Sequence, residues 1–351
     1  MNATKIFISI AILTVVFVLA IAIGSVNIPP GDIIHIILAR TIGIGDLYDI
    51  AATRVNIVWE IRLPRALLAF IVGAALAVSG AIMQSVLRNP LASSFTLGVS
   101  SGASLGAAMV LFMGVPSFFL MFNIISLSNF ALPLLGFVFG MLTILLVIAM
   151  ASKMDGRMDN NTIILVGMVL SLFINSISTL LMALNQESAQ RLIFWQMGSF
   201  LGRGWNPVTI LAPIMLVGVL LALRYHRELD IMTFGEEQSQ LMGINLRQVK
   251  WILLIISAAI TGSAIAFVGI IGFVDLVAPH IVRRIFGSRH RLIIPLSAIF
   301  GGAFMMVCDL VARTVVSPGE LPVGVVSALV GAPFFAYVYF SRGRGAKHAK
   351  A

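Results

Sequence analysis

Few side chains in this sequence could carry out chemistry, and they do not gather into a catalytic set. No nucleophile and base converge, and the histidines fall in different segments. The phosphate-binding pattern G-x-x-x-x-G-K-[ST] is missing, so the chain cannot bind ATP in that way. We predict no catalytic residue, no metal site and no cofactor. The histidines are His35, His226, His280, His290 and His348.

Acidic residues offer one other kind of chemistry, which is ion coupling. Carriers driven by protons or sodium usually bury acids among their membrane spans. Of the 14 acidic residues, only Asp275 and Asp309 stand where burial in a span is expected. An ion-coupled secondary transporter therefore stays open as an alternative. The single cysteine, Cys308, lies in an apolar run and cannot form an intramolecular disulfide.

The most distinctive stretch is a polar loop at 224–250, which carries eight charged residues between two long apolar segments. Within it Glu237 and Gly243 stand six positions apart, a spacing at which a glycine in a left-handed turn closes a short helix. The loop is predicted to form a helix, a turn and a return into the bilayer at Trp251. Such an element suits a rigid projection that presses into a soluble partner, although an ordinary solvated loop is the simpler alternative.

The composition places these elements in a membrane. The chain has 351 residues, of which 59% are hydrophobic and 11% charged, and its mean hydropathy is +1.05. These values exclude a soluble globular domain and a disordered chain. We predict a single all-α integral membrane domain over residues 1–351. The net charge of +9 does not require nucleic acid, because basic residues collect in cytoplasmic loops of membrane proteins.

Ten membrane spans are predicted, each from a run of roughly 20 apolar residues. The eighth is expected to be short and broken, because Asp275, Pro279 and His280 interrupt it. An N-terminus inside and ten spans put most Lys and Arg residues on the inner side, so both termini and the 224–250 loop are predicted to be cytoplasmic. The spans are 6–26, 66–87, two between 88 and 153, 162–184, 206–223, 251–274, a short segment between 269 and 283, 292–311 and 321–341.

Several motifs together resemble the FecCD family of ABC importer permeases, which includes permeases for iron-siderophores, haem and cobalamin. The resemblance covers nearly all of the chain from Trp59 to Tyr339. It rests on RLPRALLAFIVGAALAVSGAIMQSVLRNPLASSFTLGVSSGASLGAA, IFWQMGSFLGRGW, GEEQSQLMGIN, IGFVDLVAPHIVRRIFG and DLVARTVVSPGELPVGVVSALVGAPFF.

The resemblance implies a type II ABC importer permease with ten spans in a bacterial inner membrane. It implies four kinds of partner: a second permease subunit, as homodimer or heterodimer, a cytoplasmic ABC ATPase dimer, an extracytoplasmic substrate-binding protein and the lipid bilayer. The commonest substrates of the family make a ferric siderophore the expected cargo, with cobalamin or haem as the alternative. Iron would travel inside its chelator, so no iron ligand is expected.

The resemblance also suggests roles for individual residues. The loop from Asp230 to Leu246 is similar to the coupling helices that rest on the ATPase, which implicates Asp230, Glu236, Glu237 and Gly243. Outward-facing arginines of the family that contact the binding protein match Arg62, Arg65 and Arg313. The inner gate and pathway match Asn89, Leu91, Asn160 and Asn161.

One residue departs from the family pattern. This chain has GFVDL where GFVGL is the common form, which places Asp275 at a glycine position. Asp275 is either a tolerated acid near the membrane interface or a partner of a positive group such as Arg313 or of a hydrogen-bond donor at a subunit interface. A carboxylate near hydrocarbon is costly without a partner or water. The first alternative therefore requires water at Asp275, and the second requires a partner group in contact with it.

Overall fold

The computed structural model of the chain describes residues 2–348 except 25, 27, 45–46, 48–49, 115–129 and 156–157. Every regular element in these residues is a helix, which confirms the all-α class. In chain order the elements are α1 (Asn2–Ala22), α2 (Pro30–Thr41), α3 (Ala52–Asn56), the π-helix η1 (Ile57–Arg62), α4 (Leu63–Val86), α5 (Val99–Met113), α8 (Ala131–Met154), α9 (Asn160–Leu184), α10 (Gln186–Gln196), α11 (Trp205–Arg224), α12 (His226–Met232), α13 (Glu236–Leu241), α14 (Leu246–Val268), α15 (Val274–Phe286), α16 (His290–Thr314) and α17 (Val323–His348).

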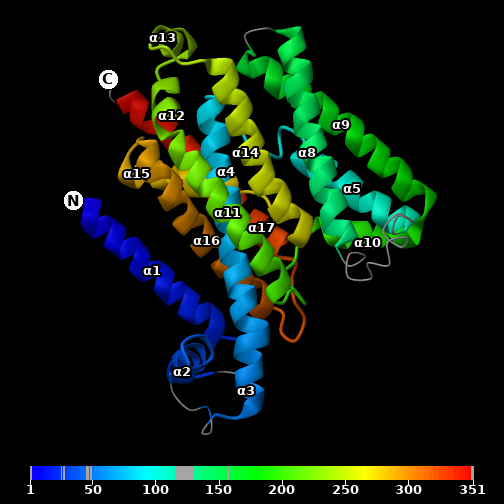
Figure 1. The fold of residues 1–351 in the computed structure, drawn as a ribbon, viewed down its shortest axis with the longest axis vertical. Helices are drawn as coiled ribbons and strands as arrows, with labels where there is room; N and C mark the ends of the chain where they lie inside the picture. The colour runs from blue at the N-terminus through cyan, green and yellow to red at the C-terminus, as the bar shows by residue number, and fades with distance from the viewer. Residues whose placement is uncertain are drawn as a thin grey trace.

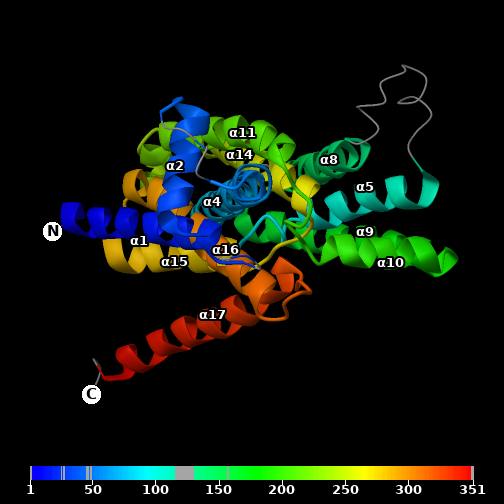
Figure 2. The ribbon, with the colours of Figure 1, turned by 90° about the horizontal axis from the view of Figure 1, so that it is seen from below.

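Helix α4 forms the centre of the bundle, and nearly all of its residues are buried. It packs against α16, α14, α15 and α11, which surround it in Figure 2. Small residues permit this packing, since a Cβ added to Gly73 would stand 2.2 Å from the carbonyl oxygen of Gly301 on α16. Helices in lipid associate through such close contact, because no hydrophobic effect drives them together. The small residues at 73–85 therefore let α4 pack closely against its neighbours.

Each predicted span corresponds to a helix. Seven helical stretches among the described residues are long and apolar enough to cross a membrane, and they comprise α1, α4 with its preceding turns, α8, α9, α11, α14 and α16. Helix α5 and the start of α17 are shorter apolar helices, and α15 has 13 residues. The number of crossings and the side of the termini stay predictions. The turn expected at 114–116 and 126–129 lies, apart from Gly114, outside the described residues.

The eighth span is short, as predicted, but Asp275, Pro279 and His280 do not break it, because all three lie within the continuous helix α15. The break in the chain lies before them, between α14 and α15. Helix α14 ends at Val268, short of the expected end at Val274, because Gly269 takes a left-handed φ of +81°. A Cβ there would stand 2.0 Å from the carbonyl oxygen of Trp195. The carbonyl oxygen of Val268 accepts a hydrogen bond from the backbone N of Ser199 at 2.8 Å. Protein therefore covers this irregular backbone, which is the condition for having one at membrane depth.

The two ends of the bundle carry different elements (Figure 1). Helices α12 and α13 lie at one end, and α2 and α3 lie at the opposite end. We call these the α12–α13 end and the α2–α3 end. Helix α1 begins near the α12–α13 end, where Nζ of Lys5 donates to the carbonyl oxygen of Ile285 on α15 at 3.0 Å.

Candidate functional site

The α12–α13 end contains a polar cleft of about 570 Å³. Its walls come from the end of α4, the start of α9 and the turn into α13, which are far apart in the sequence. Residues predicted separately for coupling and for the inner gate therefore line one cleft. They are Asn160, Asn161, Glu236 and Glu237, and Arg88 lines the cleft beside them.

The helix and glycine turn predicted in the polar loop are both present. Helix α13 carries Glu236 and Glu237 in its first turn, where acidic side chains favour the helix dipole. Gly243 has a φ of +84°, and the backbone N of Ile244 donates back to the carbonyl oxygen of Ser239 at 3.1 Å. No heavy atom lies within 4 Å of an ideal Cβ at Gly243. The left-handed backbone, and not a lack of space, thus favours glycine here.

Helix α12 is fastened to the rest of the bundle through Asp230. Its Oδ1 accepts hydrogen bonds from the backbone N and the Nδ1 of His290, at 2.8 and 2.6 Å. The Nε2 of His290 lies 2.6 Å from Oγ of Ser85, near the end of α4. Ser239 is buried and donates from Oγ to the carbonyl oxygen of Ile231 at 3.1 Å, which holds α13 against α12. Asp230 therefore contacts the bundle while its side chain stays partly exposed, and its coupling role stays a prediction.

Glu236 is also engaged internally, with a residue that sequence reasoning missed. Lys250 has no exposed surface and donates from Nζ to Glu236 Oε1 and to the carbonyl oxygen of Met158, both at 2.7 Å. The expected return into the bilayer at Trp251 put this lysine in the loop, where lysine usually extends into water. Helix α14 instead begins at Leu246 and takes Lys250 into the interior. The sequence pattern offers no signal for that burial.

The predicted gate residues come from two turns. Asn160 and Asn161 open α9, where Asp159 caps the helix by accepting the backbone N–H of Asn161 at 2.9 Å. Both asparagines line the cleft. Asn89 and Leu91 lie in the turn after α4, where Asn89 Oδ1 accepts the backbone N–H of Leu91 at 2.9 Å. Asn89 and Leu91 do not line the cleft, although Leu87 and Arg88 do. The gating role of the two asparagines of α9 and of these two residues stays a prediction.

The three arginines predicted at the outer mouth have internal partners. Arg65 donates from Nε and Nη2 to Asp309 at 2.9 and 2.8 Å, and also contacts Glu320. Arg62 donates to two carbonyl oxygens at the end of α1, at 2.8 and 2.9 Å. Nε of Arg313 lies 3.6 Å from Asp309 Oδ2, and its Nη2 donates to another carbonyl oxygen of α1. They hold α1, α4 and α16 together, and their docking role stays a prediction.

Asp275 lies in the first turn of α15 and is 3% exposed. Its Oδ2 has no hydrogen-bond partner among the described residues, while its backbone oxygen accepts from Gln84 Nε2 at 3.0 Å. Arg313, which was considered as a partner, is engaged by Asp309 and α1 instead. The carboxyl group has hydrogen bonds with the Ser93 side chain and with the backbone at Asp275 and Leu276. The positive end of the α15 dipole is also favourable for its charge.

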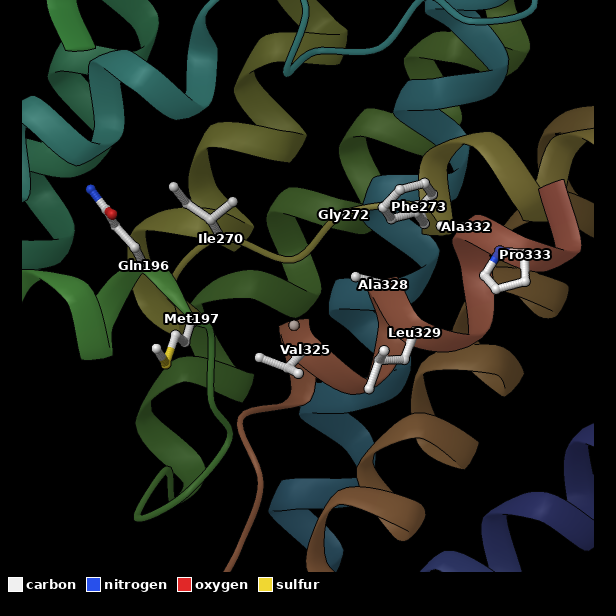
Figure 3. Close-up of a pocket in the computed structure, with 11 residues that line it drawn as sticks. Gln196, Met197, Ile270, Gly272, Phe273, Val325, Ala328, Leu329, Ala332 and Pro333 are labelled. Atoms are coloured by element: carbon white, nitrogen blue, oxygen red, sulfur yellow. The ribbon is translucent and has the colours of Figure 1, made fainter. Parts of the chain in front are cut away.

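A second pocket, of about 630 Å³, is apolar and lies between the end of α10, the segment 269–273 and α17. Figure 3 shows Gln196 and Met197 on one side of it and Ala328 and Leu329 on the other. Leu329 is 68% exposed. This wall of the pocket is therefore open to lipid or to another subunit.

The described residues form a bundle of apolar helices with a compact polar helix pair at one end, which is the architecture of a multi-pass helical membrane protein. The chain belongs to the FecCD transport family, whose model matches residues 12–341. This confirms the resemblance stated from the motifs.

Individual relatives match most of the chain. It is 38% identical over 340 residues to the uncharacterized ABC transporter permease protein YvrB of Bacillus subtilis, with 97% of this chain and 94% of the relative covered. It is 35% identical to the cobalamin import system permease protein BtuC of Halobacterium salinarum, covering 84% and 76%. It is 38% identical to the Fe(3+) dicitrate transport system permease protein FecD of Escherichia coli, covering 80% and 84%.

A solved structure has the same fold. An inward-facing conformation of an ABC transporter assigned to the metal-chelate type matches with a TM-score of 0.81 and 26% identity, covering 97% of this chain and 99% of that one. The chain is therefore a multi-pass membrane permease of the ABC-transporter class and not an enzyme.

Proposed function

We propose that this permease imports ferric siderophores, with cobalamin or haem chelates as the alternative cargo. The observation that supports ATP-driven import is the position of α13 beside the cleft that Asn160 and Asn161 line. The proposed contact element, α13, thus adjoins the start of α9, the helix expected to line the pathway. The relationship to an iron-dicitrate permease supports an iron chelate, and the relationship to a cobalamin permease supports the alternative.

The α12–α13 end is the proposed docking surface for a cytoplasmic ATPase dimer. Phe234, Leu241 and Met242 are 63%, 88% and 59% exposed, although they lie in a polar loop. Exposed apolar side chains rimmed by charge are typical of protein interaction sites. Glu237 is exposed beside them and supplies charge to this surface. Asp230 and Glu236 support the surface from inside, through the contacts described above.

A second permease subunit is proposed to cover the apolar face near α9 and α17. Leu172 and Phe173 on α9 are 68% and 63% exposed, and the apolar pocket of Figure 3 lies against α17. Two such faces, placed against each other, would enclose a pathway between subunits. The same faces could contact lipid in a monomer, so the oligomeric state of the purified protein tests this part of the proposal.

The cargo is tested by co-purification. The permease should bring down an ABC ATPase and a substrate-binding protein from its own cell, and the binding protein should then be titrated with ferric siderophores, cobalamin and haem. Tight binding of a ferric siderophore supports the proposal. Selective binding of cobalamin or haem would replace the cargo with the alternative, and purification without an ATPase would contradict the proposed coupling.

A further inference from the structure

Lys250 connects three elements beside the polar cleft at the α12–α13 end. It belongs to α14, it is fully buried, and both hydrogen bonds from its Nζ are 2.7 Å long. One goes to Glu236 at the first position of α13, and the other goes to the backbone of Met158 before α9. A single ammonium group therefore joins the proposed docking helix to the helix that is expected to line the pathway.

The Met158 end of this junction has an unusual backbone. Met158 takes a φ of +55°, a conformation that residues other than glycine seldom adopt, and its side chain is fully buried. Its backbone N donates to the carbonyl oxygen of Asp155 at 2.9 Å, and Asp155 Oδ2 accepts the backbone N–H of Asp159 at 2.9 Å. Strained backbone persists only where its surroundings hold it in place, and such positions are frequent in functional and switch regions.

Stability alone does not explain a lysine at this position. Replacing a buried ion pair by well-packed apolar residues is often neutral or stabilising, because two charges lose their hydration on burial. A buried ammonium group offsets the free-energy cost of its desolvation where its hydrogen bonds must hold a specific geometry. Here it fixes the distance between one carboxylate on α13 and one carbonyl oxygen before α9.

We propose that Lys250 is a positioning residue that transmits movement of α13 to the start of α9, so that ATPase motion reaches the gate. This inference rests on the proposed coupling role of α13. When the ATPase displaces α13, the hydrogen-bonded pair carries the Met158 turn with it. Asn160 and Asn161, which follow that turn, then shift together with the docking helix. The tie from Asp230 to His290 connects α12 to α16 and α4 instead, so it does not supply this connection.

The connection from Glu236 through Lys250 to Met158, called the tie below, fixes the distance between α13 and the start of α9. Spin labels on Gln240 and Asn161, which are both exposed, measure that distance. The only native cysteine, Cys308, is 2% exposed, so cysteines introduced at these two positions label selectively. In the purified permease we expect one narrow distance distribution. Lys250→Met removes both hydrogen bonds and replaces lysine with an apolar side chain of similar length. We expect this variant to broaden or split the distance distribution.

Two further variants isolate the cause. Glu236→Ala removes only the α13 side of the tie at a partly exposed residue, so the protein should fold even where Lys250→Met lowers the yield, and the distribution should broaden. Lys153→Met makes the same chemical change at an exposed lysine at the end of α8 and should leave the distribution narrow. A Lys250→Met or Glu236→Ala protein that folds and keeps the wild-type distribution would overturn the tie.

Transport gives the second readout. In vesicles with the ATPase and the binding protein, cargo delivered per ATP hydrolysed should fall roughly 2- to 30-fold in Lys250→Met, the range expected for a residue that couples two sites. A purely structural lysine would lower the melting temperature while the surviving complexes kept wild-type cargo per ATP, which would overturn the relay. Failure of the wild-type permease to bind an ATPase would instead refute the proposed function, and the spin-label result would stand on its own.

Discussion

Arg65 and Asp309 form a two-pronged ion pair across the interface of α4 and α16. Nε and Nη2 of the arginine donate to Asp309 Oδ1 at 2.9 and 2.8 Å, and the aspartate is 2% exposed. Glu320, before α17, accepts from the other side of the same guanidinium group. One cation therefore joins three segments near the α2–α3 end.

We expect Asp309→Asn to destabilise the permease strongly. The substitution removes the buried carboxylate that lies between Arg65 and Arg313 and leaves Arg65 with the partly exposed Glu320. Breaking a buried pair typically costs roughly 3–5 kcal/mol. Thermal unfolding of the purified protein measures the effect. Asp32→Asn is the matched control, because Asp32 pairs at 3.1 Å with an arginine whose side chain is 48% exposed, and such pairs contribute about 0–1 kcal/mol. Equal losses in the two variants would contradict this role for Asp309.

The docking role of the outer arginines makes a separate prediction. Replacing Arg62 and Arg65 with Glu should reduce uptake, and their internal hydrogen bonds predict that the melting temperature of the free permease falls as well. The affinity of the folded fraction for the binding protein, measured at low and high salt, separates the two causes. A docking role predicts weaker, salt-dependent binding that acid-to-Arg changes on the binding protein partly restore. Wild-type affinity at low salt would refute docking.

Gly243→Val should weaken uptake without preventing membrane insertion. A β-branched residue resists the φ of +84° that Gly243 adopts, at a cost of about 1–2 kcal/mol. Uptake and co-purification of the ATPase measure the result. Gly31→Val serves as a control, because Gly31 also has open space around its ideal Cβ but no left-handed φ. Normal uptake and ATPase binding in the Gly243 variant would argue against a docking surface that depends on this turn.

The contact between Gly80 and Asp275 predicts a large effect from one methyl group. A Cβ on Gly80 would stand 1.9 Å from the backbone oxygen of Asp275, so α4 and α15 would have to separate. Overpacking of this kind costs typically about 1–3 kcal/mol. At Gly262 on α14 the nearest atom is 3.6 Å away, so Gly262→Ala should be neutral or stabilising. A melting temperature of Gly80→Ala equal to that of wild type would show that these backbones are not in contact.

Local features of the fold could be predicted from the sequence because they depend on nearby residues. Gly243 follows a short acidic helix and closes it as the spacing indicates. The residues at 275–280 predict a broken eighth span, but α15 runs through them without interruption. The chain is interrupted earlier, at Gly269, where close contact with the Trp195 backbone sets the end of α14.

The partners of charged side chains could not be predicted in the same way. Arg65 lies 244 positions from Asp309, and Lys250 lies 92 positions from Met158. Apolar periodicity places a residue near a helix end but does not say which side chain from another helix it meets. The family resemblance implies outward-facing arginines, and the position of the polar loop implies a solvated Lys250. The structure instead pairs Arg65 with the buried Asp309 and buries Lys250 itself.

ATP-driven uptake with all ion gradients collapsed tests the central claim most directly. The permease, its ATPase and its binding protein would be reconstituted in vesicles with ionophores, and uptake of a radioactive ferric siderophore would be measured with and without ATP. We predict that uptake depends on ATP and on the ATPase and continues without a proton or sodium gradient. Uptake that proceeds without the ATPase and stops when the gradient is collapsed would contradict the account and favour an ion-coupled transporter.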